Sequence, residues 1–265
     1  AHDNDGLSAL PIAALCGHED VVGYLLEAGA NPDSIHGDLA VMSTVLGQST
    51  VDALVHIGCN RNQRVLGYTT PVEWAATKGN IRLLKALLFY GAVLEEHIKQ
   101  GALRSAAREG HLNIVEMLIE RKVPVDADVP DRKSALAEAA ENGHLDVVKT
   151  LLAAGATQRH SRWPPLTLAA ENGHTNIITF LLSVDKTCIN ALDHESMTAL
   201  ARAVEFNRVE AAQVLIEAGA DIYPYPDLNT DYDLLGTVVQ RESLEITKML
   251  LAAKADPDSH TDTPP

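Results

Sequence analysis

Apolar and polar residues along the chain follow an order that repeats about every 32 residues. In the first copy the pair Ala13-Ala14 precedes Gly17, and the apolar pairs Val21-Val22 and Leu25-Leu26 precede Gly29-Ala30. Apolar residues at positions i, i+1, i+4 and i+5 form a stripe along one side of a helix. The pattern therefore predicts four elements in each unit: a first helix that ends at a glycine, then a turn, then a second helix that ends at another glycine, and finally an extended tip.

The unit can be followed through eight copies along the chain. The position of Ala13 corresponds in the later copies to Met42, Ala75, Ala106, Ala139, Ala169, Ala203 and Val238. The predicted repeats cover residues 3–33, 34–62, 65–96, 97–127, 129–158, 159–190, 193–225 and 228–258, and together they form one repeat domain over residues 1–258. The second copy matches least well and rests mainly on residues 54–60. Residues 259–265 are polar and rich in proline, which predicts a tail or linker.

This unit resembles the ankyrin repeat, whose family pattern D-x-x-G-x-T-P-L-H-x-A-A-x-x-G-H continues with an apolar pair, two leucines and G-A-D. The resemblance covers about residues 3 to 258. It implies an all-α solenoid of stacked helix-turn-helix units with short hairpin-like tips. Trp74 falls at an inward position of its helix, so we expect it in the core. The histidines after the turn glycines match the Gly-His turn of the family, which implies a structural role rather than metal binding for His18, His111, His144 and His174.

The chain departs from the family pattern where the first helix begins. Only Thr70-Pro71 retains the Thr-Pro start of T-P-L-H. The histidine of that tetrapeptide is replaced in all copies, by Pro11, Ala40, Glu73, Arg104, Ala137, Thr167, Ala201 and Gly236. We therefore expect most of its hydrogen bonds to be missing and stability to be spread over the interfaces between repeats, with the second repeat the weakest.

Members of the ankyrin family usually contact partners through the tips and the exposed positions of the first helices. Large side chains occupy the tip position in three successive repeats, and acidic or amide residues follow the alanine pairs in the same region. The resemblance thus implies a partner-binding surface made of the anchors Trp163, Met197, Phe206 and Tyr232 beside the polar residues Glu141, Asn142, Glu171, Asn172 and Glu205. Large buried side chains dominate interface energetics. The alternative is that these side chains merely cover gaps between the tips.

Composition narrows the classes of partner. Against 36 Asp and Glu there are 21 Lys and Arg, a formal charge of −15, which opposes binding to nucleic acid or to an anionic membrane surface. The acid excess suits a basic protein partner and is also what an ordinary solvated surface carries. Cys16, Cys59 and Cys188 are far apart, as expected in a reducing compartment. With no apolar run long enough to cross a bilayer, we expect no membrane insertion and a cytoplasmic or nuclear location.

The sequence contains none of the short motifs that mark common catalytic or metal sites: HExxH, a P-loop, GxGxxG, GxSxG or paired Cys and His at zinc spacing. We therefore expect no enzyme activity, no cofactor and no metal site. The predicted function is a scaffold that holds a protein partner on the concave face of the solenoid, either alone or as the recognition domain of a larger protein. Two alternatives stay open: an array that encloses a small molecule or works as an atypical enzyme, and a structural spacer or autoinhibitory arm.

Overall fold

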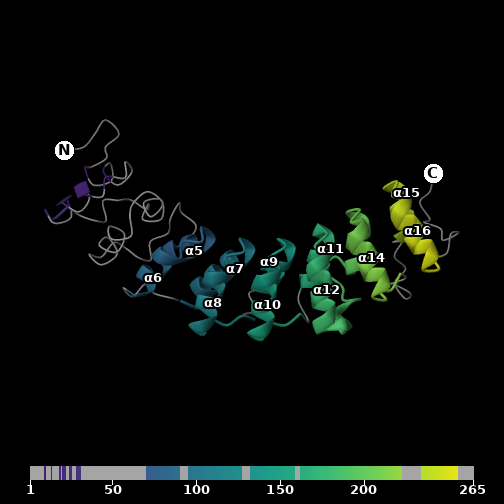
Figure 1. Cartoon of the computed structure of the whole chain (residues 1–265), viewed down its shortest axis with the longest axis horizontal. Helices are drawn as coiled ribbons and strands as arrows, with labels where there is room; N and C mark the ends of the chain where they lie inside the picture. The colour runs from purple at the N-terminus through teal and green to yellow at the C-terminus, as the bar shows by residue number, and fades with distance from the viewer. Residues whose placement is uncertain are drawn as a thin grey trace. The chain divides into compact units, whose positions relative to one another are not determined.

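The computed structural model describes residues 70–89, 95–126, 132–158, 162–222 and 234–255, with scattered positions between residues 9 and 30. The chain divides into two compact units, residues 1–123 and residues 124–265, and each is described by itself. Every regular element in the described parts is a helix, as expected (Figure 1). The predicted second repeat, residues 34–62, lies outside the described residues.

The helices come in pairs joined by short turns. The first unit contains α5 (Pro71–Thr77), α6 (Ile81–Phe89), α7 (Glu96–Arg108) and α8 (Leu112–Glu120). The second unit contains α9 (Ala135–Glu141), α10 (Leu145–Ala153), α11 (Pro165–Asn172), α12 (Thr175–Val184), the 3-10 helix η2 (Lys186–Cys188), α13 (Ala199–Glu205), α14 (Val209–Glu217), α15 (Leu234–Gln240) and α16 (Leu244–Ala252). Within this unit α9 packs beside α11 and α10 beside α12, so first helices form one row and second helices another (Figure 1).

The core of the second unit lies between successive helix pairs. The pairs Ala139-Ala140 and Ala169-Ala170 are all 0% exposed, because side chains this small let neighbouring first helices approach closely. On the second helix α10, Val147-Val148 and Leu151 are at most 2% exposed, which is the stripe that the apolar pattern predicts. In the first unit Trp74 is 9% exposed, so its predicted place in the core is confirmed.

The turn between the two helices of a repeat needs glycine for two reasons. Gly143 has a φ of +82°, in the left-handed region, and a Cβ added to it would lie 2.8 Å from the imidazole of His174 in the next repeat. That imidazole donates through Nε2 to the Glu141 carbonyl oxygen at 3.0 Å, and His111 makes the same bond to Thr77 at 3.0 Å. A structural role is thus confirmed for His111 and His174. The backbone N–H at this position also donates to the carbonyl oxygen five residues earlier in His18, His111, His144 and His174.

Towards the C-terminus other residues take over the same turn. In the repeat predicted at 193–225, Asn207 stands in the place of the glycine with a φ of +52°. Arg208 stands in the place of the histidine, and its Nε donates to the Glu171 carbonyl oxygen at 2.8 Å. In the last repeat Glu242 occupies the glycine position with a φ of +55°. In the repeat predicted at 193–225 the hydrogen bond across the repeat boundary therefore survives the loss of the Gly-His pair.

The start of the first helix keeps more hydrogen bonds than the sequence suggests. Thr70 accepts the N–H of Glu73 at 3.3 Å, and the Glu73 carboxylate accepts the N–H of Thr70 at 3.0 Å. Ser134 and Thr198 cap α9 and α13 in the same way, each accepting an N–H three residues later, at 3.1 and 3.2 Å. The expectation that most of these bonds are missing is therefore wrong for α9 and α13, because a hydroxyl at the N-cap suffices. α7 and α11 begin without a side-chain cap.

The left-handed turn at Glu242 offers a test of this geometry. A non-glycine residue in the left-handed region destabilises the folded state by roughly 1–2 kcal/mol. A glycine at the same position avoids this strain, but the greater entropy of glycine in the unfolded chain offsets about 0.5–1 kcal/mol of the gain. We therefore expect Glu242→Gly to raise the free energy of unfolding in urea by up to about 1 kcal/mol. Asn207→Gly is the matched control, with a gain of only a few tenths, because asparagine tolerates this conformation. A loss of stability in Glu242→Gly contradicts the explanation.

Candidate partner-binding surface

Three glutamates lie at the same position of three neighbouring first helices. Glu141 is the last residue of α9, Glu171 lies one residue before the end of α11, and Glu205 ends α13. Because α9 packs on α11 and α11 on α13, these half-buried side chains form a row across the second unit, which we call the acidic row. Asn142 and Asn172 follow in the chain and are exposed, and each donates its side-chain amide to the carbonyl four residues earlier.

The two ends of the acidic row carry counter-ions, while its middle does not. Lys133 Nζ pairs with the Glu141 carboxylate, and Arg202 Nη1 lies 3.0 Å from Glu205 Oε2. Among the described residues none makes a hydrogen bond or an ion pair with the Glu171 carboxylate. Burial raises the pKa of Glu171, the charge of Arg202 opposes the rise, and the charge of Glu141 adds to it. An ionised Glu171 is therefore held where another positive charge would stabilise it.

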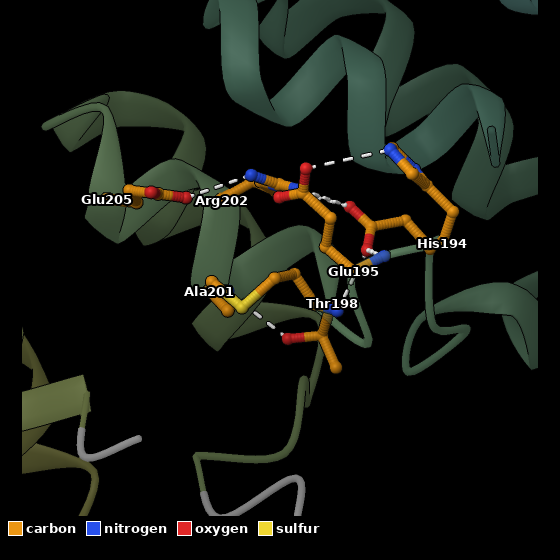
Figure 2. A network of polar contacts seen from close by, with 8 residues as sticks. His194, Glu195, Thr198, Ala201, Arg202 and Glu205 are labelled. Atoms are coloured by element: carbon orange, nitrogen blue, oxygen red, sulfur yellow. Dashed lines mark hydrogen bonds and ion pairs between the residues drawn. The ribbon is translucent and has the colours of Figure 1, made fainter. Parts of the chain in front are cut away.

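Arg202 joins the tip of its repeat to the acidic row (Figure 2). Its side chain is 9% exposed and meets three carboxylates: Asp193 at 2.8 Å, Glu195 at 2.7 Å and Glu205 at 3.0 Å. Asp193 Oδ1 also accepts the backbone N–H groups of Glu195 at 2.8 Å and Met197 at 2.9 Å, which fixes the tip. Burial alone would lower the pKa of Arg202, but its hydrogen bonds with Glu195 and Asp193 outweigh burial and raise it. Arg202 therefore stays charged.

The predicted anchors have different surroundings. Trp163 is half-buried between Arg162, whose Cζ lies 5.3 Å from the ring centroid, and His194, whose ring lies 5.8 Å away. His194 Nε2 lies 3.6 Å from Glu195 Oε1 (Figure 2). The tryptophan is therefore linked to the Arg202 cluster through His194. Phe206 is 42% exposed and follows Glu205 in the chain.

One predicted anchor is buried, and another lies outside the described residues. Met197 is 9% exposed, so it packs inside the tip instead of offering the open contact area that we expected. Tyr232 lies outside the described residues. Of the four predicted anchors, Trp163 and Phe206 lie near the acidic row. Glu205 and the Arg202 cluster connect the two.

Sequence reasoning missed Asp193, Glu195 and Arg202 as members of this surface. A signal was present for Arg202, which stands at the helix position that holds the buried Trp74 and Leu168 in other repeats. Ser105, Glu138 and Thr237 hold the same position in other repeats but are only half-buried, whereas a charged side chain that is buried needs partners. The two acids in the preceding tip are those partners.

Comparison with known proteins agrees with this fold. A family model for three consecutive ankyrin repeats matches residues 38–131, 72–161 and 136–225, and a model for a single ankyrin repeat matches residues 5–37. The chain belongs to the ankyrin-repeat family. Ankyrin-repeat domains are generally protein–protein interaction modules and are typically not catalytic. The sequence prediction of family and fold is confirmed.

A solved structure shows the same fold. The crystal structure of the human ASB11 ankyrin repeat domain has 25% sequence identity with this ankyrin chain and a TM-score of 0.69, over 81% of this chain and 99% of the other. No curated protein was found to match the sequence. Within the described residues, no helix is long and apolar enough to cross a membrane. In the same residues, no three His, Cys, Asp or Glu side chains gather as a metal-binding group.

The Arg202 cluster should carry a measurable part of the stability. Removing one partner of a buried ion pair typically costs about 3–5 kcal/mol, and the partial exposure of Glu195 and Glu205 reduces this. We expect Arg202→Ala to lower the free energy of unfolding by about 2–4 kcal/mol in urea. Glu195→Gln, at a carboxylate that is 59% exposed, should cost less than about 1 kcal/mol. Equal losses in the two variants would show that the cluster is not held by buried Arg202.

Glu171 predicts a dependence of stability on pH. The pKa of Glu171 is raised in the folded chain, so the folded chain binds this proton more tightly than the unfolded chain does. The free energy of unfolding therefore falls as the pH rises from the ordinary carboxyl pKa through the raised value. Glu171→Gln removes the penalty. We therefore expect the variant to be more stable than the parent near neutral pH, with a difference that narrows below the ordinary carboxyl pKa. Thermal unfolding across that range measures it, with Glu210→Gln on the exposed side of α14 as the control; a difference that grows in acid contradicts the explanation.

Proposed function

We propose that this ankyrin domain holds a protein partner across the first helices and tips of the repeats at residues 129–225, the side that is concave in ankyrin arrays. We further propose that the partner presents a basic segment to the acidic row. The observation that carries this proposal is Glu171, a half-buried carboxylate in the middle of the row whose pKa is raised by burial and by neighbouring Glu141. A lysine or arginine from a partner would remove the cost of ionising it.

The charge of the surface supports a basic partner. Glu141, Glu171 and Glu205 together with the tip acids Asp193 and Glu195 make five carboxylates, against three cations, Lys133, Arg162 and Arg202. The surface thus keeps an excess of negative charge after its internal ion pairs have formed. Such an excess speeds the approach of a basic partner and disfavours acidic ones.

Two aromatic side chains give this surface apolar contact area. Phe206 is 42% exposed beside one end of the acidic row, and half-buried Trp163 lies beside the Arg202 cluster. Interfaces usually take most of their binding energy from a few such side chains, surrounded by polar contacts that exclude water. We therefore assign Phe206 and Trp163 as anchors and the acidic row as the polar part that selects the partner.

We infer that the domain works in the cytoplasm or nucleus, a setting that suits the buried thiol of Cys188. It would act there as a scaffold or as the recognition domain of a larger protein. We also propose that residues 1–258 form one domain of eight repeats.

Affinity capture with paired variants tests the surface. The chain is immobilised and incubated with lysate at low and high salt, beside a variant carrying Glu171→Lys and Phe206→Ala. The control carries Glu210→Lys and Val184→Ala, which make the same change of charge and also shorten an exposed apolar side chain, but lie on the second helices α14 and α12. Circular dichroism verifies the folding of all three proteins.

We expect the parent and the control to capture the same basic protein, and the site variant to capture it at least about tenfold more weakly. Capture by the parent should also weaken with salt, because exposed charges attract less at high ionic strength. Equal capture by the site variant and the control would place the binding surface elsewhere on the chain.

A further inference from the structure

The last helix pair that the structure describes is apolar on two opposite sides. One side packs on α13 and α14 and contains Val238, Ile246 and Leu250, which are at most 1% exposed. The other side is open: Val239 is 62% exposed, and Leu244 and Leu251 on α16 are 64% and 42% exposed. Because Leu244 and Leu251 lie seven residues apart, they occupy the same side of the helix.

The equivalent positions of earlier repeats are covered by the next helix pair. The position of Val239 is held by Ala140, Ala170 and Val204 in the three preceding repeats, where exposure is at most 1%. The position of Leu244 is held by Leu145, Thr175 and Val209, and that of Leu251 by Leu152, Leu182 and Ile216, all of them half-buried. Each of these repeats has a following helix pair in the second unit. The open side of α15 and α16 therefore has the side chains of an interface between repeats.

Thr247 completes this side. Its equivalents Val148, Ile178 and Ala212 are fully buried, whereas Thr247 is half-buried. The Thr247 hydroxyl donates to the Ser243 carbonyl oxygen at 2.8 Å, so covering it leaves no polar group without a partner. We call Val239, Leu244, Thr247 and Leu251 the C-terminal flank. Repeats that close a solenoid usually carry polar residues on their outer side, whereas three of the four residues of the C-terminal flank are apolar.

We propose that the C-terminal flank is an interface for one more helix pair, which stacks on α15 and α16 as these stack on α13 and α14. The occupant is a helical protein segment whose facing residues are small and aliphatic, because only such residues let first helices approach as closely as in the rest of the unit. The charged residues near the flank, Arg241, Glu242, Glu245 and Lys248, are of both signs. Apolar burial rather than net charge therefore selects the occupant, and this inference does not depend on the proposed function.

The probe for the test is a repeat of this chain itself. A second copy of residues 129–158 is joined directly after residue 258, which preserves the repeat spacing, and is compared with the chain that ends at residue 258. The copy contains the 7-residue helix α9 and the 9-residue helix α10. If the flank is a stacking interface, circular dichroism shows these additional helices folded, and hydrogen exchange of the α16 amides slows at least about tenfold.

Substitutions on the flank decide whether stacking causes that protection. Leu244→Lys with Leu251→Lys places two charges on the flank and should abolish the slowing in the extended chain. Glu245→Lys adds a lysine to the exposed side of the same helix and should retain it. The proposal is overturned if hydrogen exchange is no slower in the extended chain than in the chain ending at residue 258. It is also overturned if the double-lysine variant shows the same slowing as the extended parent.

Two further measurements exclude other occupants. Sedimentation velocity of the 265-residue chain over a range of concentrations should give the same species for the parent and for the double-lysine variant. A dimer that this variant abolishes would assign the flank to a second copy and overturn the proposal. If hydrogen exchange of the α16 amides becomes faster after removal of residues 256–265, the flank is covered by the chain's own C-terminal segment and the proposal is overturned. Unchanged exchange supports the proposal.

Discussion

The structure depends on one constraint: a helix pair of this kind has apolar residues on two sides and can bury them only against another pair. The alanine pairs of the first helices and the valine and leucine stripe of the second helices have no other cover within their own repeat. Gly143 and His174 then fix the spacing, because the imidazole occupies the space over the glycine and bonds to the carbonyl of Glu141. Packing and polar contacts thus join the same two neighbours, so stability is a property of boundaries between repeats.

This constraint explains which parts of the fold the sequence could predict. Small residues at the helix contacts and glycines at left-handed turns recur at fixed spacing, so their roles follow from position alone. Arg208 shows where position stops being enough. It keeps the bond to the preceding repeat although neither Asn207 nor Arg208 matches the Gly-His pattern, because a guanidinium reaches the same carbonyl as an imidazole.

The candidate site was harder to predict because it depends on how side chains reach across repeats. The spacing assigned Glu141, Glu171 and Glu205 to one row, which follows from period alone. The burial of Met197 depends instead on the fold of the tip. There Ser196 has a φ of +61°, and the Asp193 carboxylate accepts hydrogen bonds from two backbone N–H groups. No repeat pattern contains that turn, so tip residues were assigned as open contacts without the information that decides between surface and core.

Stability and recognition make opposite demands on the acidic row. A neutral residue at Glu171 would remove the cost of burying a charge and the repulsion from Glu141 and Glu205, yet the same change would remove the negative charge to which we propose that a basic segment binds. The C-terminal flank involves a different compromise, because exposed valine and leucine cost little in the folded chain but increase the tendency to associate. The two surfaces should therefore differ in physical behaviour. The proposed binding at the acidic row should weaken with salt, whereas the proposed burial of the flank should give a negative change in heat capacity and little dependence on salt.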